Sequence, residues 1–91
     1  MNIYELADLI DQELVITRYP NENNRFSCSF DDTETKVSKE DSFLTSRFGD
    51  GKSPSAAVKD YARKIRGKLL VIGAMSGSRK EFQVPKNLRV I

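Results

Sequence analysis

The sequence predicts an α+β protein, in which one antiparallel sheet of about four to six strands carries a short N-terminal helix and one main helix. Two observations carry this prediction. The main helix has a clear start, body and end, and the segments on both sides of it are rich in β-branched and aromatic residues. The expected order is α-β-β-β-α-β-β. A chain of 91 residues is below the size at which chains usually divide, so residues 1–91 are expected to form a single domain.

The main helix is predicted over residues 53–66. Ser53 is a good N-cap, Pro54 suits the first helical position, and Gly67 can take the left-handed conformation that ends a helix. Apolar residues recur between them at helical spacing and form one stripe, which consists of Ala57, Val58, Tyr61, Ala62 and Ile65. This stripe should face the sheet.

The N-terminal helix is predicted within residues 1–11. Asn2 can cap it, and Glu5 stands three residues later, in the position that completes a capping box. One face is apolar, with Ile3, Leu6, Ala7 and Ile10. A helix of two to three turns is marginal alone and needs packing to persist.

A β meander is predicted over residues 14–48. It begins with a hairpin of residues 14–19 and 25–30 around the turn cluster 20–24. In the second strand, strict alternation places one set of side chains toward the main helix, namely Phe26, Cys28 and Phe30.

Two further strands complete the meander. Residues 33–38 form a weaker, polar strand, in which Lys36 and Lys39 suit a sheet edge. Residues 43–48 are predicted as a strand that ends at the turn Gly49-Asp50-Gly51.

After the main helix, a β hairpin is predicted over residues 69–84. Residues 69–74 form an apolar strand, 76–78 a turn, and 81–84 a returning strand that Pro85 stops. Residues 86–91 form a tail, either frayed or docked through Leu88, Val90 and Ile91.

Composition favours a small globular protein and excludes several classes. The chain is 38% hydrophobic and 31% charged, and no run of 18 apolar residues could cross a membrane. Acidic residues near the N-terminus argue against a signal peptide, and a single cysteine, Cys28, favours a reducing cytoplasm. Cys28 lies in an apolar alternation, which is typical of a buried, inert thiol.

No catalytic constellation is evident. The chain has no histidine, so neither a Ser-His nor a Cys-His nucleophilic pair can form, and we predict neither an enzyme nor a cofactor. Two groups of carboxylates could ligate a metal, but they lack the calcium-loop spacing and are interpreted as solvated turn residues; they are Asp31, Asp32 and Glu34, and Glu40 and Asp41.

Gly51-Lys52-Ser53 before a helix invites comparison with a phosphate loop. The full pattern needs a glycine at the position of Ser46, and Pro54 removes a backbone donor. A turn and cap is therefore the favoured interpretation. A looser anion site at Lys52 and Ser53 stays open as a weaker alternative.

Charge is unevenly distributed. Residues 1–50 hold eleven acidic and five basic residues, whereas residues 51–91 hold two and ten. This asymmetry indicates a charged partner or head-to-tail self-association, unless the charges intermix once the chain folds. The candidate partner-binding residues are Lys59, Arg63, Arg66, Lys68, Arg79 and Lys80. A solvated helix face is the structural alternative for them.

The stretch Gly49-Asp50-Gly51-Lys52-Ser53-Pro54-Ser55-Ala56-Ala57-Val58 resembles the small domain of HicB antitoxins, which has a similar turn leading into a helix after a β meander. The resemblance covers about residues 14–72. It implies a partial RNase-H-like fold and an antitoxin role. The N-terminal helix, the segment 31–41 and the final hairpin depart from that family.

The whole chain also resembles small α+β proteins of phages and prophages, among them anti-CRISPR and other inhibitors of host defence. The stretch Tyr61-Ala62-Arg63-Lys64-Ile65-Arg66-Gly67-Lys68-Leu69 and the ending Glu81-Phe82-Gln83-Val84-Pro85 carry this resemblance. It implies a host defence protein as partner and the host cytoplasm as location. It implies a role for no individual residue.

The expected function is therefore binding without catalysis. The first hypothesis is a phage-type inhibitor that docks on a host defence protein through the basic helix face and the 76–80 hairpin tip, or through the acidic segment 31–41. The second hypothesis is a nucleic-acid-binding protein that uses the same basic residues on phosphates. Little aromatic interleaving accompanies them, so a stacking platform for single strands is not predicted. A third hypothesis is a sponge for anionic nucleotides, in which the chain forms an oligomer.

Overall fold

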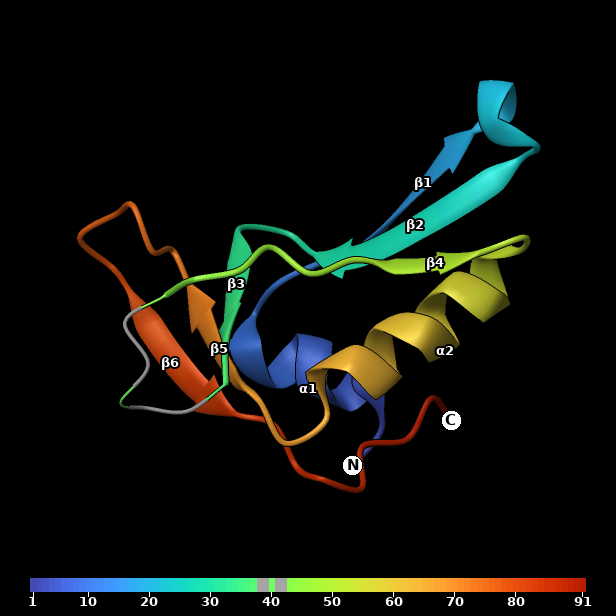
Figure 1. Cartoon of the computed structure of the whole chain (residues 1–91). Helices are drawn as coiled ribbons and strands as arrows, with labels where there is room; N and C mark the ends of the chain where they lie inside the picture. Colours follow the sequence, from blue (N-terminus) through green and yellow to red (C-terminus); the bar gives the residue numbers. More distant parts are fainter. Residues whose placement is uncertain (38–39, 41–42) are drawn as a thin grey trace.

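The computed structural model describes residues 1–37, 40 and 43–91, and it confirms the α+β class (Figure 1). Two helices lie against two small sheets. In chain order the elements are α1 (Ile3–Ile10), β1 (Leu14–Tyr19), a 3-10 turn (Pro20–Glu22), β2 (Arg25–Phe30), β3 (Thr33–Lys36), β4 (Gly49–Gly51), α2 (Pro54–Ile65), β5 (Leu69–Ile72) and β6 (Lys80–Gln83).

The strands form two antiparallel three-stranded sheets instead of the expected single sheet. Their orders are β1-β2-β4 and β3-β5-β6. The chain changes sheet directly after β2, where Asp32 has a left-handed φ of 48°. Thr33 then pairs with Ile72 of β5, so β3 leaves the first sheet. The sequence marks a turn at this point but not the direction in which the chain leaves it.

The prediction of a strand over residues 43–48 is wrong. Within this segment, Thr45 forms an isolated bridge to Thr35, and no residue of 43–48 belongs to a named strand. The strand forms instead at the predicted turn, as β4, which pairs with β2. Gly49 and Gly51 make this pairing compatible with α2, because a Cβ on Gly51 would lie 2.6 Å from the Cβ of Ala56. β4 and α2 therefore meet at a distance that only glycine allows.

The ends of the other strands differ slightly from those predicted from the sequence. β3 ends at Lys36, before the predicted end at residue 38, and residues 38, 39, 41 and 42 of this segment lie outside the described residues. β5 ends at Ile72, two residues early, and β6 runs one residue ahead of the predicted 81–84.

Both helices begin as predicted. Asn2 Oδ1 accepts from the backbone N–H of Glu5 at 2.9 Å, while Glu5 Oε1 accepts from the backbone N–H of Asn2 at 2.9 Å, which completes the capping box. Ser53 Oγ accepts from the backbone N–H of Ala56 at 3.1 Å. Gly67 follows α2 with a φ of 70°. Local signals therefore determined the helix ends.

The core joins α2 to β2, as the apolar stripe predicts. The Tyr61 hydroxyl accepts from the backbone N–H of Phe30 at 3.1 Å, and the two rings meet edge to face with centroids 5.5 Å apart. Cys28 is buried beside them, and burial raises the pKa of its thiol to about 11, which is typical of an unreactive cysteine. The remaining core members are Ile3, Leu6, Ile10, Ala57, Val58, Ala62, Ile65, Leu70, Ile72, Val84 and Leu88.

The C-terminal segment docks through Leu88 and Val90, whereas Ile91 is 91% exposed and does not dock. Leu88 is buried, and the Arg89 carbonyl accepts from the backbone N–H of Ile3 at 2.8 Å. Neither helix of the described chain has the length and apolar character that crossing a bilayer requires.

Candidate functional site

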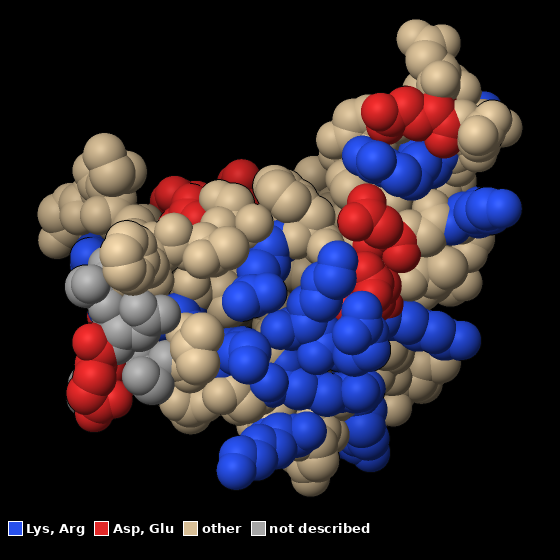
Figure 2. Space-filling model, viewed as in Figure 1, with Lys and Arg blue, Asp and Glu red and all other residues tan. Residues whose placement is uncertain are grey.

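α2 presents cations on the side opposite its apolar stripe. Lys59, Arg63 and Arg66 are spaced by four and three residues and therefore share a face. Figure 2 shows Lys and Arg gathered over α2 and over the segment at its C-terminal end. We call this surface the basic face and define it as Lys59, Arg63, Lys64, Arg66 and Lys86.

Lys86 joins this surface because the C-terminal segment runs beside the end of α2. The backbone N–H of Gly67 donates to the Pro85 carbonyl at 3.4 Å, and Arg66 Nε donates to the Leu88 carbonyl at 2.8 Å. Lys86 lies against Gly67, with its Cγ 3.3 Å from the position of an added Cβ. Residues twenty positions apart in the sequence thus form one cationic surface.

Asp60 organises the centre of the basic face. Its carboxylate pairs with Arg63 at 2.6 Å and with Lys64 at 3.0 Å, and it accepts from the backbone N–H of Asp50 at 2.8 Å. Burial alone would raise the pKa of Asp60. The Asp50 hydrogen bond and the two cations outweigh it and lower the pKa from 3.8 to about 2. Asp60 therefore ties α2 to β4 and fixes two of the cations.

Replacing Asp60 by Asn tests this arrangement. A carboxylate with a lowered pKa stabilises the fold at pH values above 3.8, the pKa of the group in the unfolded chain. This contribution disappears as the pH falls toward 2, the pKa of the group in the folded protein. We expect Asp60→Asn to lower the free energy of unfolding by about 1–2 kcal/mol at pH 7. The difference from wild type should shrink below pH 4. Urea titrations at several pH values measure both effects.

The exposed Asp31, between β2 and β3, supplies a matched control, Asp31→Asn. It makes the same chemical change on a carboxylate that has no ion pair within the described chain. Equal losses for the two variants, or a loss for Asp60→Asn that persists unchanged at pH 2, would contradict the assigned role of Asp60.

The predicted partner-binding residues differ in how they are held. Arg63 is paired with Asp60, and Arg66 is anchored to the Leu88 carbonyl. Lys59 is exposed and has no ion-pair partner among residues 1–37, 40 and 43–91. Lys68 follows α2 directly but is half-buried. Lys59 is thus the predicted cation on α2 with most freedom to meet a partner.

Arg79 and Lys80 lie apart from the basic face. Arg79 ends the loop after β5 and pairs with Glu81 at 3.3 Å, and Lys80 begins β6 opposite Ile72. In Figure 1 the loop and this end of β6 lie on the side of the molecule away from α2. The structure therefore divides the predicted set into two separate groups.

Lys52 and Ser53 precede α2. The Ser53 hydroxyl caps the helix by accepting from Ala56, and Lys52 is exposed. Gly51 belongs to β4 and faces the first turn of α2. The segment packs strand on helix, and its shape is unlike that of a loop wrapped around a phosphate.

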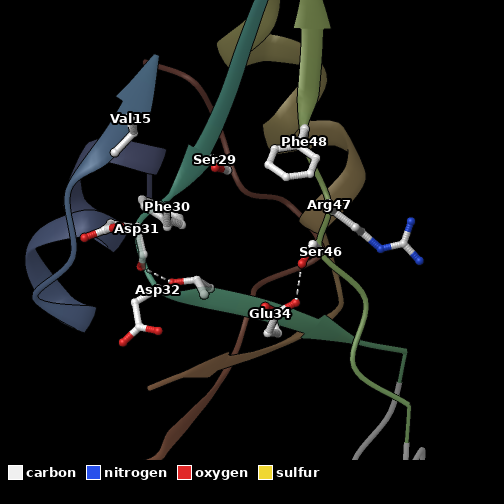
Figure 3. A pocket seen from close by; sticks show the side chains of 10 residues that line it. Val15, Ser29, Phe30, Asp31, Asp32, Glu34, Ser46, Arg47 and Phe48 are labelled. Atoms are coloured by element: carbon white, nitrogen blue, oxygen red, sulfur yellow. Dashed lines mark hydrogen bonds between the residues drawn. The ribbon is translucent and has the colours of Figure 1, made fainter. Parts of the chain in front are cut away.

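A pocket of about 220 Å³ lies where the chain before β4 diverges from β2 (Figure 3). Ser46 Oγ donates to Glu34 Oε2 at 2.6 Å across it. In Figure 3 the side chains of Asp31, Asp32 and Arg47 point to different sides. No three carboxylate, cysteine or histidine side chains of the described residues are placed to hold a metal ion.

Sequence reasoning did not identify Asp60 as part of the site. Its spacing of three and four residues from Arg63 and Lys64 is the signal that indicates these ion pairs. The proximity of Lys86 to α2 has no such local signal, because it depends on how the C-terminal segment docks.

Comparison of the chain with protein-family models, with curated proteins and with solved structures gave no match in any of the three.

Proposed function

We propose that this protein acts by binding, and that the basic face docks on an acidic surface of a partner protein. The observation that supports this proposal is the clustering of Lys and Arg over α2 and the adjoining C-terminal segment (Figure 2). Charge complementarity of this kind raises association rates and selects partners. An inhibitor of the phage type, acting on a host defence protein such as a CRISPR effector, is the specific form of this proposal that the sequence resemblance implies.

A protein partner is favoured over nucleic acid by the composition of the surface. Asp60 lies among the cations and neutralises part of their charge. Tyr61, the aromatic residue of α2, is buried in the core and offers no stacking surface. A surface of mixed charge suits a partner with arranged carboxylates and hydrogen-bond acceptors better than a uniform phosphate backbone.

Nucleic-acid binding is the second candidate. Lys59 and Arg63 are exposed one helical turn apart on the same face, a spacing at which both can reach phosphates of one backbone. This candidate uses the same surface and is separated from the first by experiment.

The test captures partners from bacterial lysate with the tagged wild-type chain and two charge-reversed variants, with and without nuclease. One variant, Lys59→Glu with Arg63→Glu, alters the basic face. Its control, Arg79→Glu with Lys80→Glu, makes the same change of charge at the distant site, and each pair contains one ion-paired arginine. Mass spectrometry identifies what each chain retains.

We expect an acidic protein that survives nuclease and is bound by wild type and control, with at least about tenfold less recovered by the basic-face variant. Equal capture by all three chains would overturn the role of the basic face. Nucleic acid retained alone, and lost with nuclease or in the basic-face variant, would support the second candidate.

A further inference from the structure

The outer strand of the first sheet has an open edge. β1 pairs with β2 on one side, and in the order β1-β2-β4 no strand of the described chain lies on its other side. In Figure 1 the β1–β2 hairpin projects from the body of the protein. Four of the six residues of β1 are apolar or aromatic, and three of these remain about two-fifths exposed: Val15 (40%), Ile16 (43%) and Tyr19 (38%).

The hydrogen-bond pattern identifies which backbone groups face this edge. The backbone N–H of Asp31 donates to the Glu13 carbonyl at 2.9 Å, directly before β1. Residues of an antiparallel strand alternate between bonding the partner and pointing away from it. The N–H and C=O groups of Leu14, Ile16 and Arg18 therefore point to the open side, and β1 can pair with another strand without rearranging β2.

A groove beside this edge is lined by both apolar and polar side chains, and two of the polar ones are carboxylates. It has a volume of about 490 Å³ and lies between α1 and β1. Apolar side chains from both elements line it. Of its two carboxylates, Glu13 directly precedes β1 and Asp8 belongs to α1. Its lining consists of Tyr4, Ala7, Leu14 and Ile16, together with Asp8, Gln12 and Glu13.

The two edge strands of the second sheet, β3 and β6, are different in character. In β3 the backbone N–H and C=O of Thr35 are already bonded to Thr45. β6 carries Lys80 and Glu81, and charged residues on an edge strand discourage pairing with another chain. The N–H of Asp50 in β4 is already bonded to Asp60. Within the described chain, β1 is the edge strand that combines length, apolar side chains and free backbone groups.

We propose that β1 pairs with β1 of a second copy of this chain, in antiparallel register about a two-fold axis at Ile16. Ile16 then faces Ile16 of the second copy, and Leu14 faces Arg18. The three outward-pointing residues of each strand lie opposite one another, giving about six backbone hydrogen bonds. The β1-β2-β4 sheet of one copy and the same sheet of the second copy then join into one continuous sheet. Because both copies use the same surface, the interface is isologous and the contact closes as a dimer.

Charge favours a second copy as the occupant. Each strand begins directly after Glu13, which lines the groove together with Asp8 of α1, and carries Arg18 near its other end. The antiparallel two-fold places Arg18 of each copy over the acidic end of the groove in the other copy, so the attraction forms twice. Within one chain Arg18 donates to Asn24 Oδ1 at 2.7 Å, and its other N–H groups remain available.

The dimer is tested first by its mass in solution, measured by light scattering and sedimentation over a range of concentrations. Ile16→Pro removes an outward-pointing N–H and leaves the bonds to β2 in place, so the fold should persist. We expect wild type to be a dimer and the dissociation constant of the variant to be at least about tenfold higher, because two hydrogen bonds at the axis are lost. Circular dichroism checks that the variant is folded.

Cross-linking tests the register independently of proline. Ile16→Cys places one thiol from each copy at the axis, and buried Cys28 leaves the background clean. Under mild oxidation this variant should form a covalent dimer. Thr17→Cys is the matched control, because its residue faces Val15 of the second copy and lies on the other side of the sheet.

A wild type that is monomeric up to about millimolar concentration would overturn the proposal. A dimer that is unaffected by Ile16→Pro, or that cross-links equally well through position 17, would overturn it too, because the contact would then lie elsewhere. A covalent dimer formed through position 16 and not through position 17 supports the proposed register.

Discussion

Replacing Gly49 by Ala is expected to lower the free energy of unfolding by about 3 kcal/mol or more, the largest loss we expect from any single methyl group added to this chain. The added Cβ would clash with the Ala57 carbonyl and with the backbone N of Tyr61, and would lie 2.6 Å from the Tyr61 Cβ. Two of these three atoms belong to the helix backbone, which cannot move aside as a flexible side chain can. Either β4 must leave α2 or the helix must shift against its core.

Gly77→Ala is the matched control. An added Cβ at Gly77 meets no atom within 4 Å. The free energy of unfolding of this variant should therefore lie within about 0.5 kcal/mol of the wild-type value. Urea unfolding of both variants, followed by circular dichroism, measures the difference. A Gly49→Ala variant as stable as Gly77→Ala would contradict the packing of β4 on α2. The φ of Gly49 is not in the left-handed region, so the expected loss is steric.

The helices were predictable because their determinants are local. Asn2, Glu5 and Ser53 make the expected capping bonds within one helical turn. The apolar stripe of α2 is buried as its spacing indicates, and Tyr61 reaches the expected strand. The helical periodicity of apolar residues and the capping residues are enough to predict such helices, since the capping contacts are made by neighbours in the sequence.

The division into two sheets depends on contacts that no short window contains. Asp32 redirects the chain, and only the pairing of Thr33 with Ile72, 39 positions later, shows where the redirected strand goes. The position of β4 is a similar case. Glycines favour turns by propensity, but here Gly49 and Gly51 form a strand because α2 leaves no room for a side chain.

The candidate site, too, could be predicted from local sequence patterns only in part. The spacing of Lys59, Arg63 and Arg66 predicts one helix face, and α2 has that face. Arg79 belongs to a different side of the molecule because the pairing of β5 with β6 carries it away. Lys86 comes close to α2 through docking of the C-terminal segment. Helical spacing thus identified part of the surface, and long-range packing determined the rest.

Tyr61→Phe is expected to lower the free energy of unfolding by about 1–3 kcal/mol, because it leaves the backbone N–H of Phe30 buried without an acceptor. β4 pairs with β2 only as far as Gly49 opposite Cys28, so the next position along β2 has no strand partner on that side. The Tyr61 hydroxyl takes that place at 3.1 Å. The substitution keeps the ring, so the loss reports the hydrogen bond and not the core packing.

The dependence on pH separates this role from a general effect on packing. Burial raises the pKa of Tyr61 from 10.0 to about 12, so the neutral hydroxyl stabilises the fold below pH 10, and this contribution is lost as the pH rises toward 12. The difference in stability between wild type and Tyr61→Phe should therefore narrow across that range. Tyr4→Phe, at an exposed position on α1, is the control. Its free energy of unfolding should stay within about 0.5 kcal/mol of the wild-type value. If Tyr61→Phe lost no more stability than Tyr4→Phe, the Tyr61 hydroxyl would have no part in joining α2 to β2.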